Sequence, residues 1–194
     1  QGNPVEAAGR LVRAVLAAAS PDVRAIAVTG SGREAVATVL RAAYPDAFAR
    51  IVVQNEIVAH APAAIRLDDA HGESLSVVEI GGQDAKFIKI AGGQIVESDL
   101  NKACSAGTGS FLEEQATLYG VADIDAFTRL ATEGERPPDL GQMCTVFVAE
   151  AAAEAQAEGF SLADVFAGFQ YSVIHNYKNR VMGQRQFGRR VFFQ

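Results

Sequence analysis

The first part of the chain alternates between helical and strand-like patterns of apolar residues. An apolar stripe at helical spacing, opened by Asn3 and Pro4 and followed by Pro21, predicts the first helix. Short apolar runs then alternate with helical patterns. Strands are expected within residues 23–28 and at 51–53, and helices at about 33–44 and from about 55. This alternation is typical of α/β proteins.

The middle of the chain changes to the two-residue period of β-strands. Residues 75–80, 85–90 and 94–100 have the composition of short strands, and "GGQD" at 81–84 and "GG" at 92–93 separate them. Glycines between short strands are typical of tight hairpin turns. The pattern therefore predicts a β-meander.

Helical periodicity dominates the rest of the chain. "SFLEEQATLYG" has a Ser110-x-x-Glu113 spacing that predicts a capping box, and the segments "DIDAFTRLATEG", "CTVFVAEAAAEAQAEG" and "SLADVFAGFQYSVIHNYKNRVM" each predict a helix. On the last of these helices, His175, Asn176 and Arg180 are expected on a solvated face. The closing "RRVFFQ" is strand-like, and Arg185, Arg189 and Arg190 are expected in a solvated loop.

Composition narrows the class of protein. The chain has 194 residues, 49% of them hydrophobic, and a formal net charge of −6. The charge argues against a nucleic-acid partner held by a basic surface, and no apolar run is long enough to predict a membrane span. Two cysteines do not make a disulfide scaffold, so a reducing cytoplasm is expected. Both ends look cut from a longer protein.

The "EIGGQDAK" segment is a candidate phosphate site. Gly81 and Gly82 allow a ligand to approach the backbone closely, and consecutive N–H groups in such a turn bind phosphate oxygens. Glu79 and Asp84 flank the turn, where carboxylates hold Mg²⁺ or orient a water molecule. The alternative is a plain hairpin turn with surface carboxylates.

Two cysteines precede predicted helices. Cys104 precedes "SAGTGSF", and Cys144 precedes "TVFVAEAAAEAQAEG". A helix N-terminus stabilises a thiolate, so each cysteine could be a ligand, although free cysteines are often only small apolar residues. An iron–sulfur cluster takes four cysteines, so two chains or two modules would have to share it.

Together these motifs resemble one family. "VVEIGGQDAKFI", "NKACSAGTGSFLEEQA" and "MCTVFVAEAAAEAQ" resemble the ATP-dependent activators of 2-hydroxyacyl-CoA dehydratases and the ATPase subunits of benzoyl-CoA reductase. "TGSGRE", "NEIVAHA" and "YSVIHNYKNRV" fit the same family in order and spacing. Within "NEIVAHA", Glu56 and His60 lie one helical turn apart and are expected to form a pair on the helix surface. The alternative is that Glu56 and His60 face the nucleotide cleft.

The resemblance implies a fold and a function. The fold is α/β and ribonuclease H-like, as in the acetate/sugar kinase–Hsp70–actin superfamily. Residues 1–72 would be the remainder of its first lobe, and 73–194 its second lobe. A cytoplasmic activator of this family would bind ATP or ADP with Mg²⁺ and share a [4Fe–4S] cluster with a second copy or a sister module. It would take electrons from ferredoxin or flavodoxin and pass one to a CoA-thioester dehydratase or reductase.

The resemblance also implies roles for single residues. Cys104 and Cys144 match the cluster ligands, and residues 81–84 match the second phosphate loop. The expected catalytic residues are Glu79, Gln83 and Asp84. The expected cofactor-binding residues are Gly81, Gly82, Gly107, Thr108 and Gly109.

The sequence departs from the family pattern in ways that keep alternatives open. The usual first phosphate turn and the adenosine-binding glycine turn are absent, so we expect this stretch alone to lack half of the nucleotide pocket. Glu79 stands where the family usually has Asp, and the extra methylene displaces the carboxylate by about 1.5 Å. A non-catalytic module of the same fold is one alternative. A small-molecule kinase of the superfamily is another.

Overall fold

A computed structural model describes residues 3–18, 23, 25–45, 51–101 and 107–194. The chain forms two compact units, residues Gln1–Ala63 and Ala64–Gln194. The boundary between these units lies inside a helix. The expected division into lobes at residues 1–72 and 73–194 stays a prediction. Each unit is described by itself.

The first unit has the helices and strands that its sequence predicts. Its elements are α1 (Pro4–Ala18), β1 (Ile26–Val28), α2 (Arg33–Ala43) and β2 (Ile51–Val53). The side chain of Asn3 accepts from the amide of Val5 at 3.0 Å, which caps α1 as predicted. The two strands pair in parallel, and buried Val28, Ala37 and Leu40 form a small core.

Helix α3 (Glu56–Leu67) carries the chain from the first unit into the second. Asn55 accepts from the amide of Ile57 at 2.9 Å and so caps its start. Glu56 and His60 form the predicted i, i+4 pair, with 3.8 Å between carboxylate and imidazole atoms. Just beyond the helix, the side chain of Asp68 accepts from the amide of Gly72.

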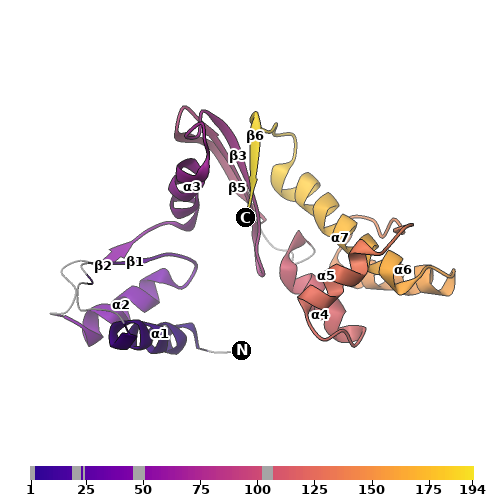
Figure 1. Cartoon of the computed structure of the whole chain (residues 1–194), viewed down its shortest axis with the longest axis horizontal. Helices are drawn as coiled ribbons and strands as arrows, with labels where there is room; N and C mark the ends of the chain where they lie inside the picture. Colours follow the sequence, from indigo (N-terminus) through magenta and orange to yellow (C-terminus); the bar gives the residue numbers. More distant parts are fainter. Residues whose placement is uncertain (1–2, 19–22, 24, 46–50, 102–106) are drawn as a thin grey trace. The chain divides into compact units, whose positions relative to one another are not determined.

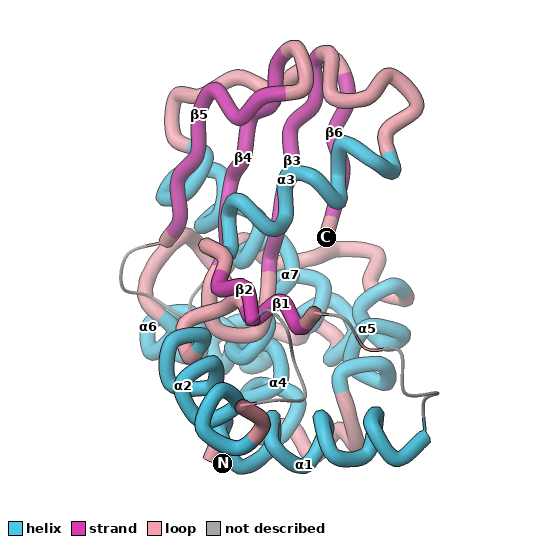
Figure 2. The backbone as a smooth tube through the Cα atoms, turned by 90° about the vertical axis from the view of Figure 1, so that its left-hand side faces the viewer, coloured by secondary structure: helices cyan, strands magenta, loops and turns pink. Residues whose placement is uncertain are grey.

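A four-stranded sheet forms one half of the second unit. The strands β3 (Ser74–Ile80), β4 (Ala85–Ala91) and β5 (Gln94–Leu100) form the predicted antiparallel meander, and β6 (Arg190–Phe193) adds a fourth strand. Figure 2 shows the order β5-β4-β3-β6 across the sheet. The strand-like end of the chain is thus a strand, and it pairs with β3 in parallel.

Two arginines near the C-terminus are tied to carboxylates, which corrects the expectation of a solvated loop. Arg190 donates two hydrogen bonds to Asp68, over 2.6 and 2.9 Å. Arg185 forms ion pairs with Glu97 and Asp99 at 2.9 Å each. Periodicity does not reveal these pairs, because they join positions far apart in the sequence.

The other half of the second unit is helical (Figure 1). Its helices are α4 (Gly109–Leu118), α5 (Ile124–Thr132), α6 (Thr145–Ala157) and α7 (Leu162–Tyr177), followed by the π-helical turn η2 (Lys178–Met182). Aromatic side chains form much of its core. Phe127 stacks on Phe166 with ring centroids 4.3 Å apart, and Phe111 meets Phe169 edge to face at 5.6 Å.

The predicted capping box of α4 is wrong. The helix begins at Gly109, its N-cap is Thr108, and Ser110 lies inside the first turn. Its first two amides donate instead to backbone oxygens of the turn between β3 and β4. Tertiary partners therefore satisfy donors that a capping box would otherwise satisfy.

Candidate functional site

The GGQD turn between β3 and β4 leaves backbone donors available for a ligand. The amide of Gly81 donates to the carbonyl of Asp84 at 2.9 Å and closes the turn. In the described part of the chain, the amides of Gly82, Gln83 and Asp84 form no hydrogen bond. Gly82 and Gln83 are also exposed. Three consecutive N–H groups of this kind suit a phosphate.

Gly81 has no room for a side chain. A Cβ atom there would lie 2.7 Å from Oε1 of Glu79 and 3.3 Å from the backbone oxygen of Asp84, whereas a Cβ atom at Gly82 would meet nothing within 4 Å. The carboxylate of Glu79 therefore lies directly against the turn. Close packing therefore explains the glycine at position 81. At Gly82 the space that a side chain would occupy is empty.

A buried lysine joins the two carboxylates of the site. Nζ of Lys86 lies 3.0 Å from Oε2 of Glu79 and 2.8 Å from Oδ1 of Asp84. Glu79 is buried, while the side chain of Asp84 is 36% exposed. Lys86 was not among the residues predicted from the sequence. The signal was present, because Glu79 and Lys86 face each other across the predicted hairpin and opposite charges at such positions attract.

The turn is hydrogen-bonded to the start of α4. The amide of Gly109 donates to the carbonyl of Gly81 at 2.8 Å, and the amide of Ser110 donates to that of Gly82 at 2.9 Å. Thr108 is fully buried, with its hydroxyl 3.2 Å from that of Ser110. The predicted roles of Gly107, Thr108 and Gly109 in cofactor binding stay predictions.

Helix α7 supports both parts of the site. The space beside Gly107 is bounded by Asn176 and Tyr177, and the Tyr177 hydroxyl donates to the backbone oxygen of Lys86 at 2.9 Å. Burial, and secondarily the charge of Glu79, raises the pKa of Tyr177, so its hydroxyl stays a donor. Asn176 is 1% exposed, which corrects the solvated face expected for it, because this end of α7 packs against the sheet.

Cys144 is the N-cap of α6, which confirms the prediction that this cysteine lies at the start of a helix. Its thiol is free and partly exposed. Cys104 lies outside the described residues. The next described residues after it are Gly107 and Thr108, which lead directly into α4.

The described residues contain no ready-made metal centre of their own. Within them, no three His, Cys, Asp or Glu side chains come together as metal ligands. Cys144 by itself fits a metal cluster only in part, because a helix N-terminus suits a thiolate ligand but one thiol does not complete a site. The described helices also include none that is long and apolar enough to cross a membrane.

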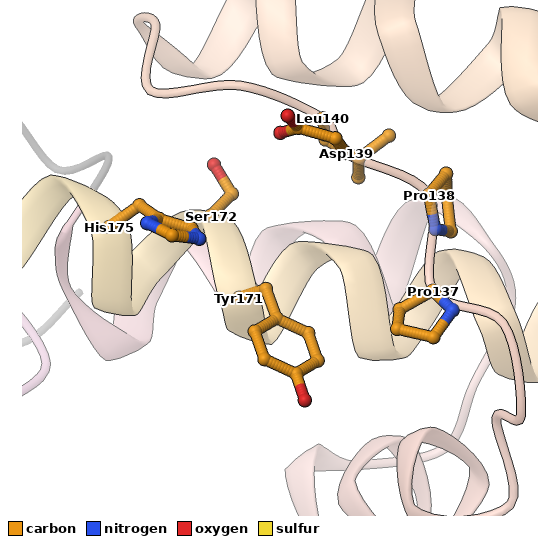
Figure 3. Close-up of a pocket in the computed structure, with 7 residues that line it drawn as sticks. All are labelled: Pro137, Pro138, Asp139, Leu140, Tyr171, Ser172 and His175. Atoms are coloured by element: carbon orange, nitrogen blue, oxygen red, sulfur yellow. The ribbon is translucent and has the colours of Figure 1, made fainter.

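A hollow on α7 takes no part in the predicted site. It has a volume of about 300 Å³ and is lined by Pro137, Pro138, Asp139, Leu140, Tyr171, Ser172 and His175. Figure 3 shows the proline loop along one side of it and α7 along the other. None of its residues was predicted to bind a cofactor, a metal or a substrate.

Curated relatives are similar to the chain over part of their length. The 2-hydroxyisocaproyl-CoA dehydratase activator of Clostridioides difficile is 29% identical over 156 residues, which are 80% of this chain and 53% of the relative. The (R)-2-hydroxyglutaryl-CoA dehydratase activating ATPase of Acidaminococcus fermentans is 32% identical over 108 residues, or 56% and 40% of the two chains. The chain thus spans about half the length of the curated relatives it matches.

Solved structures confirm the fold. Component A of the A. fermentans (R)-2-hydroxyglutaryl-CoA dehydratase superimposes with a TM-score of 0.78 at 24% identity, covering 96% of this chain and 67% of the other. The C. difficile activator, solved with bound ADPNP, gives a TM-score of 0.75 at 25% identity over 95% and 65%. The predicted α/β, ribonuclease H-like fold of the acetate/sugar kinase–Hsp70–actin superfamily is therefore confirmed.

The family model agrees with both comparisons. The family model matches nearly the whole length of the chain, and the matched residues include the GGQD turn and both cysteines. Since this match runs over residues 1–192, the chain belongs to the BadF/BadG/BcrA/BcrD ATPase family.

Proposed function

We propose that this chain is a module of an ATP-dependent activator that passes a low-potential electron to a CoA-thioester dehydratase or reductase. In this proposal the GGQD turn receives phosphate groups of ATP or ADP with Mg²⁺. Cys104 and Cys144 supply half of the ligands of a [4Fe–4S] cluster shared with a second copy or a sister module. Ferredoxin or flavodoxin would supply the electron to the cluster.

One observation carries the proposal. The first two amides of α4 donate to the carbonyls of Gly81 and Gly82, and α4 begins five residues after Cys104. The candidate phosphate turn and the helix that follows the first cysteine are therefore linked without an intervening side chain. A ligand that displaces the turn also displaces the start of α4, and a coupling of this kind requires such a shared element.

The chain's own residues would act in binding and orientation. The amides of Gly82, Gln83 and Asp84 would donate to phosphate oxygens, since they have no partner in the described chain. The carboxylate of Asp84 would hold the magnesium ion, and the exposed side chain of Gln83 would orient a water molecule. The buried carboxylate of Glu79 would keep the turn in place from behind.

The surroundings of Cys144 support a protein partner at this point. Met143, Val146 and Phe147 expose 43%, 71% and 53% of their surface. Val146 and Leu118 also line one hollow of about 260 Å³ between α4 and α6. Apolar side chains beside a partly exposed thiol would be covered if a second copy supplied the other two cysteines. When bound, the cluster would supply one-electron chemistry, and the cysteines would hold it.

A second candidate is a regulatory module that keeps the fold without turning over ATP. One observation favours it: Lys86 already pairs with both carboxylates of the turn, as in a site that has replaced a metal ion with a protein cation. Nucleotide binding with no hydrolysis in the complete protein would support this candidate.

Anaerobic reconstitution tests the main proposal. The chain is supplied with iron and sulfide, and iron content, the visible spectrum and mass in solution are measured together. The proposal predicts a dimer with about two irons per chain, and loss of the iron in Cys104→Ser and in Cys144→Ser. An iron-free monomer would count against a cluster built by this chain alone. Binding of ADP with and without Mg²⁺ to the same samples tests the turn separately.

A further inference from the structure

Lys86 places a positive charge in the interior of the site. Its side chain is only 2% exposed, and it is among the largest fully buried side chains of the described chain. Lysine side chains normally extend to solvent and are buried only when paired. Here the partners are Oε2 of Glu79 at 3.0 Å and Oδ1 of Asp84 at 2.8 Å. The three groups form one ionic cluster, in which Lys86 and Glu79 are buried and Asp84 is partly exposed.

The fold fixes where this charge lies. Lys86 stands opposite Glu79 in the register of β3 and β4, and Asp84 ends the turn two residues earlier. The Tyr177 hydroxyl holds the backbone oxygen of Lys86 at 2.9 Å, so α7 also restrains the residue. Strand pairing and helix packing therefore set the position of the ammonium group. A flexible surface lysine would not be held in this way.

The charge matters because the turn combines amide donors with two carboxylates. A phosphate bound at Gly82 and Gln83 would lie beside Asp84, and like charges repel. We propose that Lys86 is the positioning residue of this site. It holds Glu79 and Asp84 in one arrangement, and it cancels one of their two negative charges so that an anionic ligand can approach. The inference rests on the proposed nucleotide function of the turn.

This role also explains Glu79 in place of the aspartate usual in the family it resembles. The carboxylate of Glu79 reaches Lys86 at 3.0 Å. Shortening the side chain by one methylene would withdraw the carboxylate by about 1.5 Å. In this chain the longer side chain of Glu79 reaches the lysine, which also pairs with the more exposed carboxylate of Asp84 at 2.8 Å.

The first test is a thermodynamic cycle on the full chain, read by urea unfolding. Lys86→Met removes the charge and keeps a similar length. In the wild-type background this change leaves the carboxylates of Glu79 and Asp84 without the lysine charge. We therefore expect the folding equilibrium constant to fall about a hundredfold. In a Glu79→Gln, Asp84→Asn background we expect a fall of less than about tenfold. Equal losses in the two backgrounds would show that Lys86 only fills space, and would overturn the proposal.

The second test is Mn²⁺ binding without nucleotide, measured by electron paramagnetic resonance. We expect Lys86→Met to bind Mn²⁺ about tenfold more tightly than the wild type, because the carboxylates lose their internal cation. A further Asp84→Asn change should abolish the gain. Unchanged Mn²⁺ affinity in Lys86→Met would overturn the charge-balancing role. A merely structural role predicts no such gain.

If Lys86→Met does not fold, two milder variants keep the proposal testable. Glu79→Gln and Asp84→Asn each remove the charge of one of these two partners of Lys86, and the double variant removes both charges. The cluster predicts that the double variant loses more stability than the two single losses added together. Simple additivity would overturn it. None of these measurements uses ATP, so they stand even if the chain proves unable to bind nucleotide.

Discussion

The backbone N–H of Gly109 donates to the carbonyl of Gly81 over 2.8 Å, so the first residue of α4 is bonded to the first glycine of the GGQD turn. This bond joins two segments that lie far apart in the sequence. It uses a donor that most helices leave to water or to a capping side chain. The start of α4 is therefore a structural part of the candidate phosphate site.

Replacement of Gly109 by proline tests this bond directly. Proline is normally favoured at the first position of a helix, and the extended backbone of Thr108 suits a residue before proline. Here the ring would replace the hydrogen that Gly81 accepts. We expect Gly109→Pro to lower the free energy of unfolding by about 1–3 kcal/mol, measured by urea titration.

Gly109→Ala is the matched control. It keeps the N–H group, and its Cβ atom would meet the nearest atoms at 3.4 and 3.6 Å, which is ordinary contact. We expect a change of less than about 1 kcal/mol, since alanine favours helices over glycine. If the proline and alanine variants were equally stable, the bond between Gly109 and Gly81 would contribute nothing.

The two glycines of the turn should differ in their tolerance of a side chain. Gly81→Ala places a methyl group 2.7 Å from a carboxylate oxygen of Glu79, and we expect it to cost about 1–3 kcal/mol of stability. Gly82→Ala meets nothing within 4 Å and should be neutral within about 1 kcal/mol. Urea unfolding of both variants gives the comparison. A larger loss in Gly82→Ala would contradict this packing.

The exposed apolar residues beside Cys144 should matter for assembly and little for folding. Val146→Ser and Phe147→Ser change side chains that are 71% and 53% exposed, so stability should move by less than about 0.5 kcal/mol each. If this surface faces a second copy, both variants should lower the dimer fraction and the iron content after reconstitution. Light scattering and iron analysis measure these quantities.

Tyr171→Ser controls for the loss of any exposed apolar side chain. Tyr171 is 57% exposed on α7 and borders the hollow beside the proline loop, which Cys144 does not line. The Tyr171→Ser substitution should leave the dimer fraction and the iron content unchanged. If Tyr171→Ser lowered the dimer fraction as much as Phe147→Ser, the interface would not be specific to the start of α6.

Local patterns predicted most elements, because their signals lie within a few residues. The apolar stripe closed by proline gives α1, and the glycine turns between short apolar runs give the meander of β3, β4 and β5. Cys144 was correctly expected at a helix start for the same reason. Signals of this kind depend on the period of one segment and need no knowledge of its neighbours.

Relationships between distant segments could not be predicted in this way. Pairing of β6 with β3 joins residues more than a hundred positions apart. The burial of Asn176 follows from where α7 meets the sheet. The capping box at Ser110 failed because Gly81 and Gly82 already satisfy the first amides of α4. In each case a tertiary partner overrides a local preference.

Asp164 provides a pH-dependent contribution to the stability of the helical half. Its Oδ1 accepts from the amides of Glu135 and Arg136 at 2.9 and 2.7 Å, and its Oδ2 accepts from the hydroxyl and amide of Ser161 at 2.7 and 3.2 Å. The amide of Arg136 foremost, and then the hydroxyl of Ser161, lower the pKa of Asp164 below its ordinary 3.8. The carboxylate is thus held ionised in the folded chain.

The sign of the pH effect follows from this lowered pKa. The stabilisation by Asp164 is complete above the ordinary carboxyl pKa of 3.8 and is lost as the pH falls through the lower folded value. Asp164→Asn offers only one oxygen to four donors, so it should lower the urea midpoint at pH 7 and flatten the fall in stability below pH 4. Asp123→Asn is the control, because Asp123 caps α5 through one oxygen and Asn caps equally well. Equal urea midpoints for Asp164→Asn and Asp123→Asn at pH 7 would show that the Asp164 carboxylate makes no special contribution to stability.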